Sequence, residues 1–177
     1  MIPSLLDYIL IKNKIPVDIL QECMECVESA DYNRYLKPDT AERVPHTSVQ
    51  HALLPKELND KINKLVNPFL NSYKLTRNIE PLTKLDFWTI NKYDVNCSMN
   101  IHTDNYKLVD NIPKTVVLNL IILLNDNYTG GELYFFKDHK LDINPGDVII
   151  YPGNFLFPHE VKKVLSGSRY TLVTSLY

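Results

Sequence analysis

All five glycines of this 177-residue chain lie between positions 130 and 167, and each one separates two short apolar segments. Glycine is the default residue of tight turns because it adopts positive φ angles at little steric cost. We expect hairpin turns at Gly130-Gly131 and Ser166-Gly167, and a β-turn at Asn144-Pro145-Gly146-Asp147. Turns at such short intervals restrict the second half of the chain to short strands.

The segments between these turns have the hydrophobic pattern of strands, beginning at about Leu82. Residues 115–124 are nearly all apolar, which is typical of a strand buried on both faces. The predicted strands cover residues 84–89, 99–102, 115–124, 132–136, 141–143, 147–151, 160–164 and 169–177. About eight short strands in this order predict a sandwich or jelly roll.

The first half of the chain has helical spacing instead. One apolar face begins near Pro16 and a second near Pro55, and Pro68 should kink or end the second helix. We therefore predict a mainly β fold with supporting helices (α+β), in which the N-terminal helices pack on one sheet. Residues 1–177 should form one domain, with helical support over about 1–80 and the β core over about 82–177.

Charge and composition exclude several classes of function. The net charge is −2, so we expect no broad electrostatic binding to nucleic acid or to an anionic membrane. The apolar stretches are too short for a membrane span, and no basic leader begins the chain, so we expect a cytoplasmic protein. Cys23 and Cys26 form a CxxC, which we interpret as two positions on a helix face rather than a redox or metal pair.

His102 and Asp104 are the strongest candidates for chemistry, because side chains at i and i+2 of a strand point the same way. His159 follows Asp104 by 55 residues (159 − 104) and could supply a third ligand. Two histidines and one carboxylate suit non-haem Fe(II) and leave coordination positions open. A hydrolytic zinc site is the main alternative, although the sequence offers no obvious general base for it.

Arg169 lies ten residues beyond His159 and shares one face of the last predicted strand with Thr171. A guanidinium binds a carboxylate through two parallel hydrogen bonds, and a hydroxyl can add a third. If Ser166-Gly167 formed a two-residue turn, His159 and Arg169 would be offset by about five residues, roughly 16 Å. An extended five-carbon dicarboxylate and the arginine side chain could span that gap.

Two further residues have two open interpretations each. Asn119 is the polar exception in a buried strand, and it either hydrogen-bonds a co-substrate or is paired inside the barrel. Tyr93 either reaches the pocket or is a core aromatic residue. The remaining histidines show no ligand spacing, and we expect them to be solvated: His46, His51 and His139.

Several short motifs occur in a fixed order from about Trp88 to the C-terminus. They are Tyr93 to Asp104, Leu124-Asn125 with Gly130-Gly131-Glu132-Leu133, Pro145-Gly146-Asp147, His159-Glu160-Val161 and Gly167-Ser168-Arg169-Tyr170. On these motifs the chain resembles the prolyl 4-hydroxylase-like branch of the 2-oxoglutarate/Fe(II)-dependent oxygenases. The resemblance implies a double-stranded β-helix core, which is a jelly roll of the cupin type, with the first half as supporting helices.

The resemblance also implies the chemistry of the site. Iron(II) would be held by His102, Asp104 and His159, and Arg169 would bind the distal carboxylate of 2-oxoglutarate. The reaction would consume O₂, release succinate and CO₂, and hydroxylate an unactivated C–H bond, with ascorbate as the reductant. The expected substrate is a prolyl residue in a peptide or protein. The alternatives are a free amino acid or other small molecule, and a catalytically silent jelly-roll binding module.

Three positions depart from the pattern of that branch. Asn96 stands where that branch usually has a glycine, and Met99 stands where it usually has an aromatic residue. Leu123 stands where the branch often has a tyrosine that assists co-substrate binding. The carboxylate contact would then depend on Thr171. Two segments could form the lid that selects the substrate. They are Asp31 to Val49 and Asn105 to Lys114.

Overall fold

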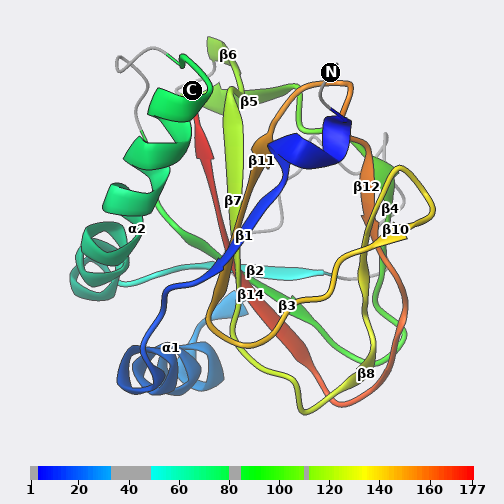
Figure 1. Cartoon of the computed structure of the whole chain (residues 1–177). Coiled ribbons are helices and arrows are strands. Elements are labelled where there is room, and N and C mark those ends of the chain that lie inside the picture. Colours follow the sequence, from blue (N-terminus) through cyan, green and yellow to red (C-terminus); the bar gives the residue numbers. More distant parts are fainter. Residues whose placement is uncertain (1–3, 33–48, 80–84, 110–111) are drawn as a thin grey trace.

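The computed structural model describes residues 4–32, 49–79, 85–109 and 112–177 of the chain (Figure 1). Helices and strands follow one another in this order: η1 (Leu5–Tyr8), β1 (Leu10–Asn13), α1 (Val17–Ser29), β2 (Gln50–Leu53), α2 (Lys56–Thr76), β3 (Thr89–Tyr93), β4 (Met99–His102), β5 (Tyr106–Val109), β6 (Ile112–Thr115), β7 (Leu118–Leu123), β8 (Thr129–Gly130), β9 (Leu133–Phe135), β10 (His139–Lys140), β11 (Asp147–Pro152), β12 (His159–Val161), β13 (Val164–Ser166) and β14 (Arg169–Leu176). This order confirms the predicted mainly β fold with supporting helices.

The larger sheet has six antiparallel strands in the order β1-β11-β7-β14-β3-β2. Every residue of β7 is buried, as predicted for a strand covered on both faces. The predicted strand over 115–124 is divided, because β6 ends at Thr115 and pairs with β5 as a separate hairpin. The smaller sheet has the order β10-β9-β12-β4 and faces the larger one.

A cluster of buried side chains from both sheets fills the space between them, and we call it the inter-sheet core. Its members are Tyr93, Cys97, Ile121, Leu133, Phe135, Leu141, Ile149, Tyr151, Phe157, Val161 and Val164. Because side chains alternate along a strand, neighbouring residues such as Ile122 and Leu172 point to the opposite face of the large sheet.

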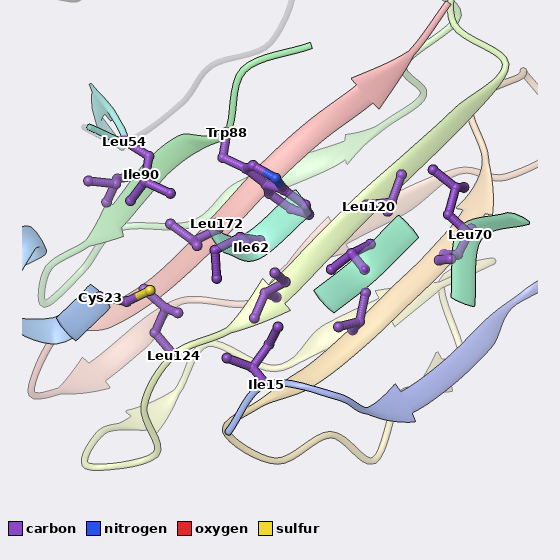
Figure 2. Packing of buried hydrophobic residues seen from close by; sticks show 14 of the residues in the cluster. Ile15, Cys23, Leu54, Ile62, Leu70, Trp88, Ile90, Leu120, Leu124 and Leu172 are labelled. Atoms are coloured by element: carbon purple, nitrogen blue, oxygen red, sulfur yellow. The ribbon is translucent and has the colours of Figure 1, made fainter. Parts of the chain in front are cut away.

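The two helices cover that opposite face. Figure 2 shows Ile62 of α2 and Cys23 of α1 packed against residues of the large sheet, in the larger of the two apolar clusters. Trp88, which is fully buried, joins α2 to the sheet: its Nε1 donates to Asn63 and its backbone N donates to Asn59. The predicted packing of the helices on one sheet is confirmed.

Helix α2 continues through Pro68 to Thr76, so the proline does not end it. In Figure 1 the teal and green turns of α2 point in different directions, as a kink at an internal proline requires. Burial raises the pKa of the Cys23 thiol to about 12, so this half of the CxxC is an inert apolar position of α1. Among the described helices, none is both long and apolar enough to cross a bilayer.

The strand pairing corrects the predicted hairpins. β13 pairs with β8, whereas β14 pairs with β3 and β7, so Ser166-Gly167 connects two different sheets. Gly130-Gly131 likewise joins β8 to β9, which pair with different partners. These glycines and Gly146 do have positive φ angles, and the Asp147 amide donates to the Asn144 carbonyl in the expected β-turn.

Three other boundaries differ from the prediction. The first half of the chain contributes both edge strands of the large sheet, β1 and β2. Each has only four residues, which show no clear alternation of apolar and polar side chains in the sequence. β10 lies at His139–Lys140 rather than at 141–143. β3 begins only at Thr89, and Leu85 forms a single bridge to Leu176.

Candidate metal centre and carboxylate pocket

Three predicted ligands come together at one end of the space between the sheets. β4 and β12 are neighbours, and their register places His102 directly opposite His159, with ring centroids 4.3 Å apart. β4 ends at His102, so Asp104 lies in the loop just after it rather than on the strand as predicted. Ligand atoms of the three side chains lie within 4.8 Å of one another.

Backbone carbonyls fix which nitrogen of each imidazole faces the centre. Nδ1 of His102 lies 2.8 Å from the Asn100 carbonyl oxygen, and Nδ1 of His159 lies 3.1 Å from that of Phe157. A carbonyl oxygen only accepts, so both Nδ1 atoms carry hydrogen, and in the neutral tautomer that this selects the lone pair lies on Nε2. Nε2 of His102 lies 3.7 Å and Nε2 of His159 lies 3.3 Å from the Asp104 carboxylate.

Burial keeps His159 in the neutral form that a metal ligand needs. The side chain is almost completely buried, and this burial lowers its pKa, while the Asp104 carboxylate opposes the shift. Metal binding requires deprotonated ligands, so a histidine already neutral loses no proton on binding.

Asn119 contacts the candidate metal centre through the Asp104 carboxylate. Its Nδ2 donates to Oδ2 of Asp104 at 2.8 Å, and its Oδ1 accepts from the Ser175 hydroxyl at 2.8 Å. Of the two interpretations left open by the sequence, the structure shows the residue paired inside the barrel. Its partner is one of the candidate metal ligands.

Sequence reasoning missed Tyr151. Its hydroxyl lies 3.3 Å from Oδ2 of Asp104 and 3.3 Å from Nε2 of His159. Burial raises its pKa well above the usual value, and Asp104 adds to the shift, so the hydroxyl keeps its proton. No local signal in the sequence marked it, because its place depends on the strand pairing that makes Tyr151 the direct partner of Asn119 on β7.

Arg169 is buried in the same interior without an anionic partner. It is 1% exposed, its guanidinium carbon lies 5.2 Å from the centroid of the Tyr93 ring, and its Nε has no hydrogen-bond partner. In the described part of the chain, no carboxylate lies within ion-pair distance of it. A buried cation is costly unless it is paired, so this arrangement is suited to an anionic ligand.

The structure also places Thr171 and two of the other histidines. Thr171, two residues after Arg169 on β14, is buried on the same face and is the partner of Asn91 on β3. Nδ1 of His51 lies 2.7 Å from Oδ1 of Asn91, and His51 is half-buried, so the prediction that it is solvated was wrong. His139 is exposed as predicted.

The predicted spacing of His159 and Arg169 along one hairpin was also wrong, because they lie on different sheets. Both side chains are buried between those sheets, so a ligand can still lie between them. Two neutral imidazoles, one carboxylate and one unpaired guanidinium fit a divalent iron and a dicarboxylate.

The structure describes most of one candidate lid segment and little of the other. Residues 106–109 and 112–115 form the β5–β6 hairpin, which begins two residues after Asp104. Most of the segment from 31 to 49, and His46 with it, lies outside the described residues.

Comparisons with known sequences agree with this site. Residues 88–177 match the family model of the 2OG-Fe(II) oxygenase superfamily. The chain is 31% identical over 125 residues to a PKHD-type hydroxylase of Prochlorococcus marinus, covering 68% of this chain and 52% of the relative. It is 31% identical over 87 residues to a PKHD-type hydroxylase of Crocosphaera subtropica, covering 46% and 38%. The chain thus spans about half the length, or less, of these curated relatives.

Solved structures match almost the whole fold. A viral collagen prolyl hydroxylase from Paramecium bursaria Chlorella virus-1 gives a TM-score of 0.71 at 18% identity, covering 96% of this chain and 94% of that one. A Pseudomonas putida prolyl-4-hydroxylase gives 0.69 at 16% identity, covering 96% and 91%. These likenesses confirm the double-stranded β-helix core. With the family match over the half of the chain that holds both histidines, Asp104 and Arg169, they lead to one conclusion: the chain belongs to the 2OG-Fe(II) oxygenase superfamily.

Proposed function

We propose that this chain is an Fe(II)- and 2-oxoglutarate-dependent dioxygenase that hydroxylates an unactivated C–H bond, with a prolyl residue of a peptide or protein as its substrate. One observation carries the proposal. Arg169, which is buried and has no anionic partner among the described residues, lies in the same inter-sheet space as the His102, Asp104 and His159 cluster. A metal site alone gives no reason to bury an unpaired guanidinium.

Each residue has a role that follows from its chemistry. His102, Asp104 and His159 would hold the metal through two neutral nitrogens and one carboxylate oxygen. Arg169 would bind the distal carboxylate of 2-oxoglutarate, with Thr171 as an additional donor and Tyr93 as the surface under the guanidinium. Bound iron would supply the activation of O₂ that is coupled to decarboxylation of 2-oxoglutarate to succinate and CO₂.

A peptidyl substrate is favoured by the structural relatives. One of them is described as a prolyl hydroxylase of Trichoplax adhaerens in complex with a peptide fragment from the oxygen degradation domain of hypoxia inducible factor. Its TM-score is 0.69 at 16% identity, which shows a common fold. The net charge of −2 gives no overall attraction to nucleic acid, so we propose peptide rather than nucleic-acid substrates.

The test is succinate formation by the purified protein with Fe(II), ascorbate and 2-oxoglutarate, in the presence and absence of proline-containing peptides. We expect peptides to stimulate succinate and to gain one oxygen atom. Turnover without stimulation by any peptide would move the substrate to a free amino acid or other small molecule. Absence of turnover by the iron-loaded protein with any substrate class would support a silent binding module instead.

The metal ligands provide the matched variants for this assay. We expect His102→Ala or Asp104→Ala to remove peptide-stimulated succinate and to leave the circular dichroism spectrum unchanged. Both positions lie at the end of β4 or just beyond it and are only partly buried, so the fold does not depend on them. Wild-type activity in either variant would contradict the metal assignment.

A further inference from the structure

The Asp104 carboxylate is held by only one of its oxygen atoms. Oδ2 accepts from Asn119 Nδ2 at 2.8 Å and from the Tyr151 hydroxyl at 3.3 Å. Among the described residues, these are the donors to the carboxylate, and neither lies on Oδ1. Oδ1 lies 3.7 Å from Nε2 of His102 and accepts no hydrogen bond from a described residue, whereas Oδ2 also lies 3.3 Å from Nε2 of His159.

The two donors belong to one row across the large sheet. Tyr151 on β11 and Ser175 on β14 are both direct partners of Asn119 on β7. A carboxylate only accepts, so the Asn119 amide must turn its NH₂ group to Asp104 and its oxygen to Ser175. The Ser175 hydroxyl donates to that oxygen at 2.8 Å and holds the amide in this orientation.

The Tyr151 hydroxyl has one proton and two acceptors at equal distance. Oδ2 of Asp104 and Nε2 of His159 both lie 3.3 Å from it. Once Nε2 of His159 donates its lone pair to a metal, it no longer accepts a hydrogen bond. The Tyr151 proton is then left for Oδ2, which has both of its in-plane lone pairs occupied.

We propose that Asn119 and Tyr151 are positioning residues that hold Asp104 by Oδ2, so that the carboxylate binds the metal through Oδ1 alone. A carboxylate that ligates through both oxygens takes one more coordination position. Single-oxygen ligation therefore keeps that position for the co-substrate or O₂. The inference rests on the proposed metal centre, and it assigns a function to two residues that act through Asp104 rather than by contact with the metal or the co-substrate.

The test uses Mn(II) with the purified full chain and needs no turnover. Affinity is measured by titration calorimetry, and water molecules on bound Mn(II) are counted by electron spin echo in deuterated water. We expect Tyr151→Phe and Asn119→Ala to weaken Mn(II) binding by about 10- to 100-fold, the range for loss of such outer partners. In the double variant Asn119→Ala/Tyr151→Phe, which removes both donors, we also expect one fewer water, because the released Oδ2 can then bind the metal.

Tyr73→Phe is the control for removal of any buried tyrosine hydroxyl. Tyr73 is 2% exposed, belongs to the apolar cluster on the helix-covered face of the large sheet, and donates one hydrogen bond to the Tyr8 carbonyl. It should bind Mn(II) with wild-type affinity and water count. If Asn119→Ala does not fold, the Mn(II) affinity of Tyr151→Phe decides the positioning role alone, since that variant removes a single oxygen atom.

Wild-type affinity in both single variants would overturn the positioning role, and an unchanged water count in the double variant would overturn single-oxygen ligation. If the unmodified protein bound no Mn(II), the proposed metal centre itself would be wrong and this inference would fall with it. The two failures are therefore distinguishable.

Discussion

Arg169 and Tyr93 are direct partners on β14 and β3, and the guanidinium carbon lies 5.2 Å from the centroid of the tyrosine ring. Both side chains are almost completely buried. A cation over an aromatic face gains on the order of 2 kcal/mol when desolvated. The ring accepts no ordinary hydrogen bond from the guanidinium edge, and Nε is left without a partner. The pair therefore forms a preorganised but incomplete site for an anion.

We expect Arg169→Met to weaken 2-oxoglutarate binding strongly while it preserves the stability of the ligand-free protein. Loss of a charged hydrogen-bonded pair costs about 2–5 kcal/mol of binding free energy. Replacing a buried charge by an apolar side chain of similar volume is often neutral or stabilising, by up to about 4 kcal/mol. Calorimetric titration of 2-oxoglutarate and urea unfolding of the metal-free protein measure the two effects separately.

Arg77→Met is the matched control for that variant. Arg77 also lies over tyrosine rings, those of Tyr8 and Tyr73, but it is exposed at the end of α2. Its replacement should leave 2-oxoglutarate binding unchanged. Equal loss of binding in the two variants would show that the Arg169 effect is not specific to its pocket.

Gly131 is the second determinant of where the guanidinium lies. Its φ angle is +67°, and an added Cβ would lie 3.0 Å from Cδ of Arg169 and 3.0 Å from Cγ2 of Val164. Gly131→Ala should cost roughly 1–2 kcal/mol of stability for the left-handed backbone and should also raise the dissociation constant for 2-oxoglutarate. Gly146→Ala, with φ +89° and neighbours from Ile15 and Asn13, should cost stability alone. Unchanged 2-oxoglutarate affinity in Gly131→Ala would contradict the contact.

The sequence was sufficient to predict four residues that the fold brings to the candidate site, and the reason is chemical. His102, Asp104, His159 and Arg169 belong to types whose spacing and order are uncommon without a function, and all of them are placed in one interior. The strands were predictable from local alternation and turn residues. The signal for the strands comes from neighbours in the sequence, and the signal for the site comes from the types and order of its residues along the chain.

Pairing between distant strands was not predictable in the same way. Ser166-Gly167 has the positive φ angle that a hairpin turn requires, yet β13 and β14 join different sheets. A glycine specifies a backbone angle and carries no information about the partner strand. For the same reason Tyr151 was missed: its role depends on the β11–β7 register that brings it beside Asn119.

Asn59 provides a test of the link between α2 and the large sheet. It is 4% exposed, and its side-chain oxygen accepts from the backbone N of Trp88 at 3.0 Å. Asn59→Ala leaves that buried N–H unsatisfied, which should cost about 1–3 kcal/mol of unfolding free energy. Asn63→Ala should cost less, because Asn63 is only partly buried and water can replace its bond to the Trp88 ring. Urea unfolding measures both. An equal cost would show that burial of the acceptor does not decide the loss.

The pH dependence of stability should report the burial of His159. In the unfolded chain its pKa is near 6.5, whereas burial lowers it in the folded protein. Below pH 6.5 the unfolded state therefore binds more protons, and the free energy of unfolding of the metal-free protein should fall as the pH decreases toward the lowered value. Well above pH 6.5 this residue should contribute no slope, since it is then neutral in both states. Urea unfolding at a series of pH values between about 8 and about 5 measures the slope against the ordinary histidine range. His159→Gln should flatten it, whereas His139→Gln, which removes an exposed histidine, should not. An unchanged slope in His159→Gln would mean that another group is responsible.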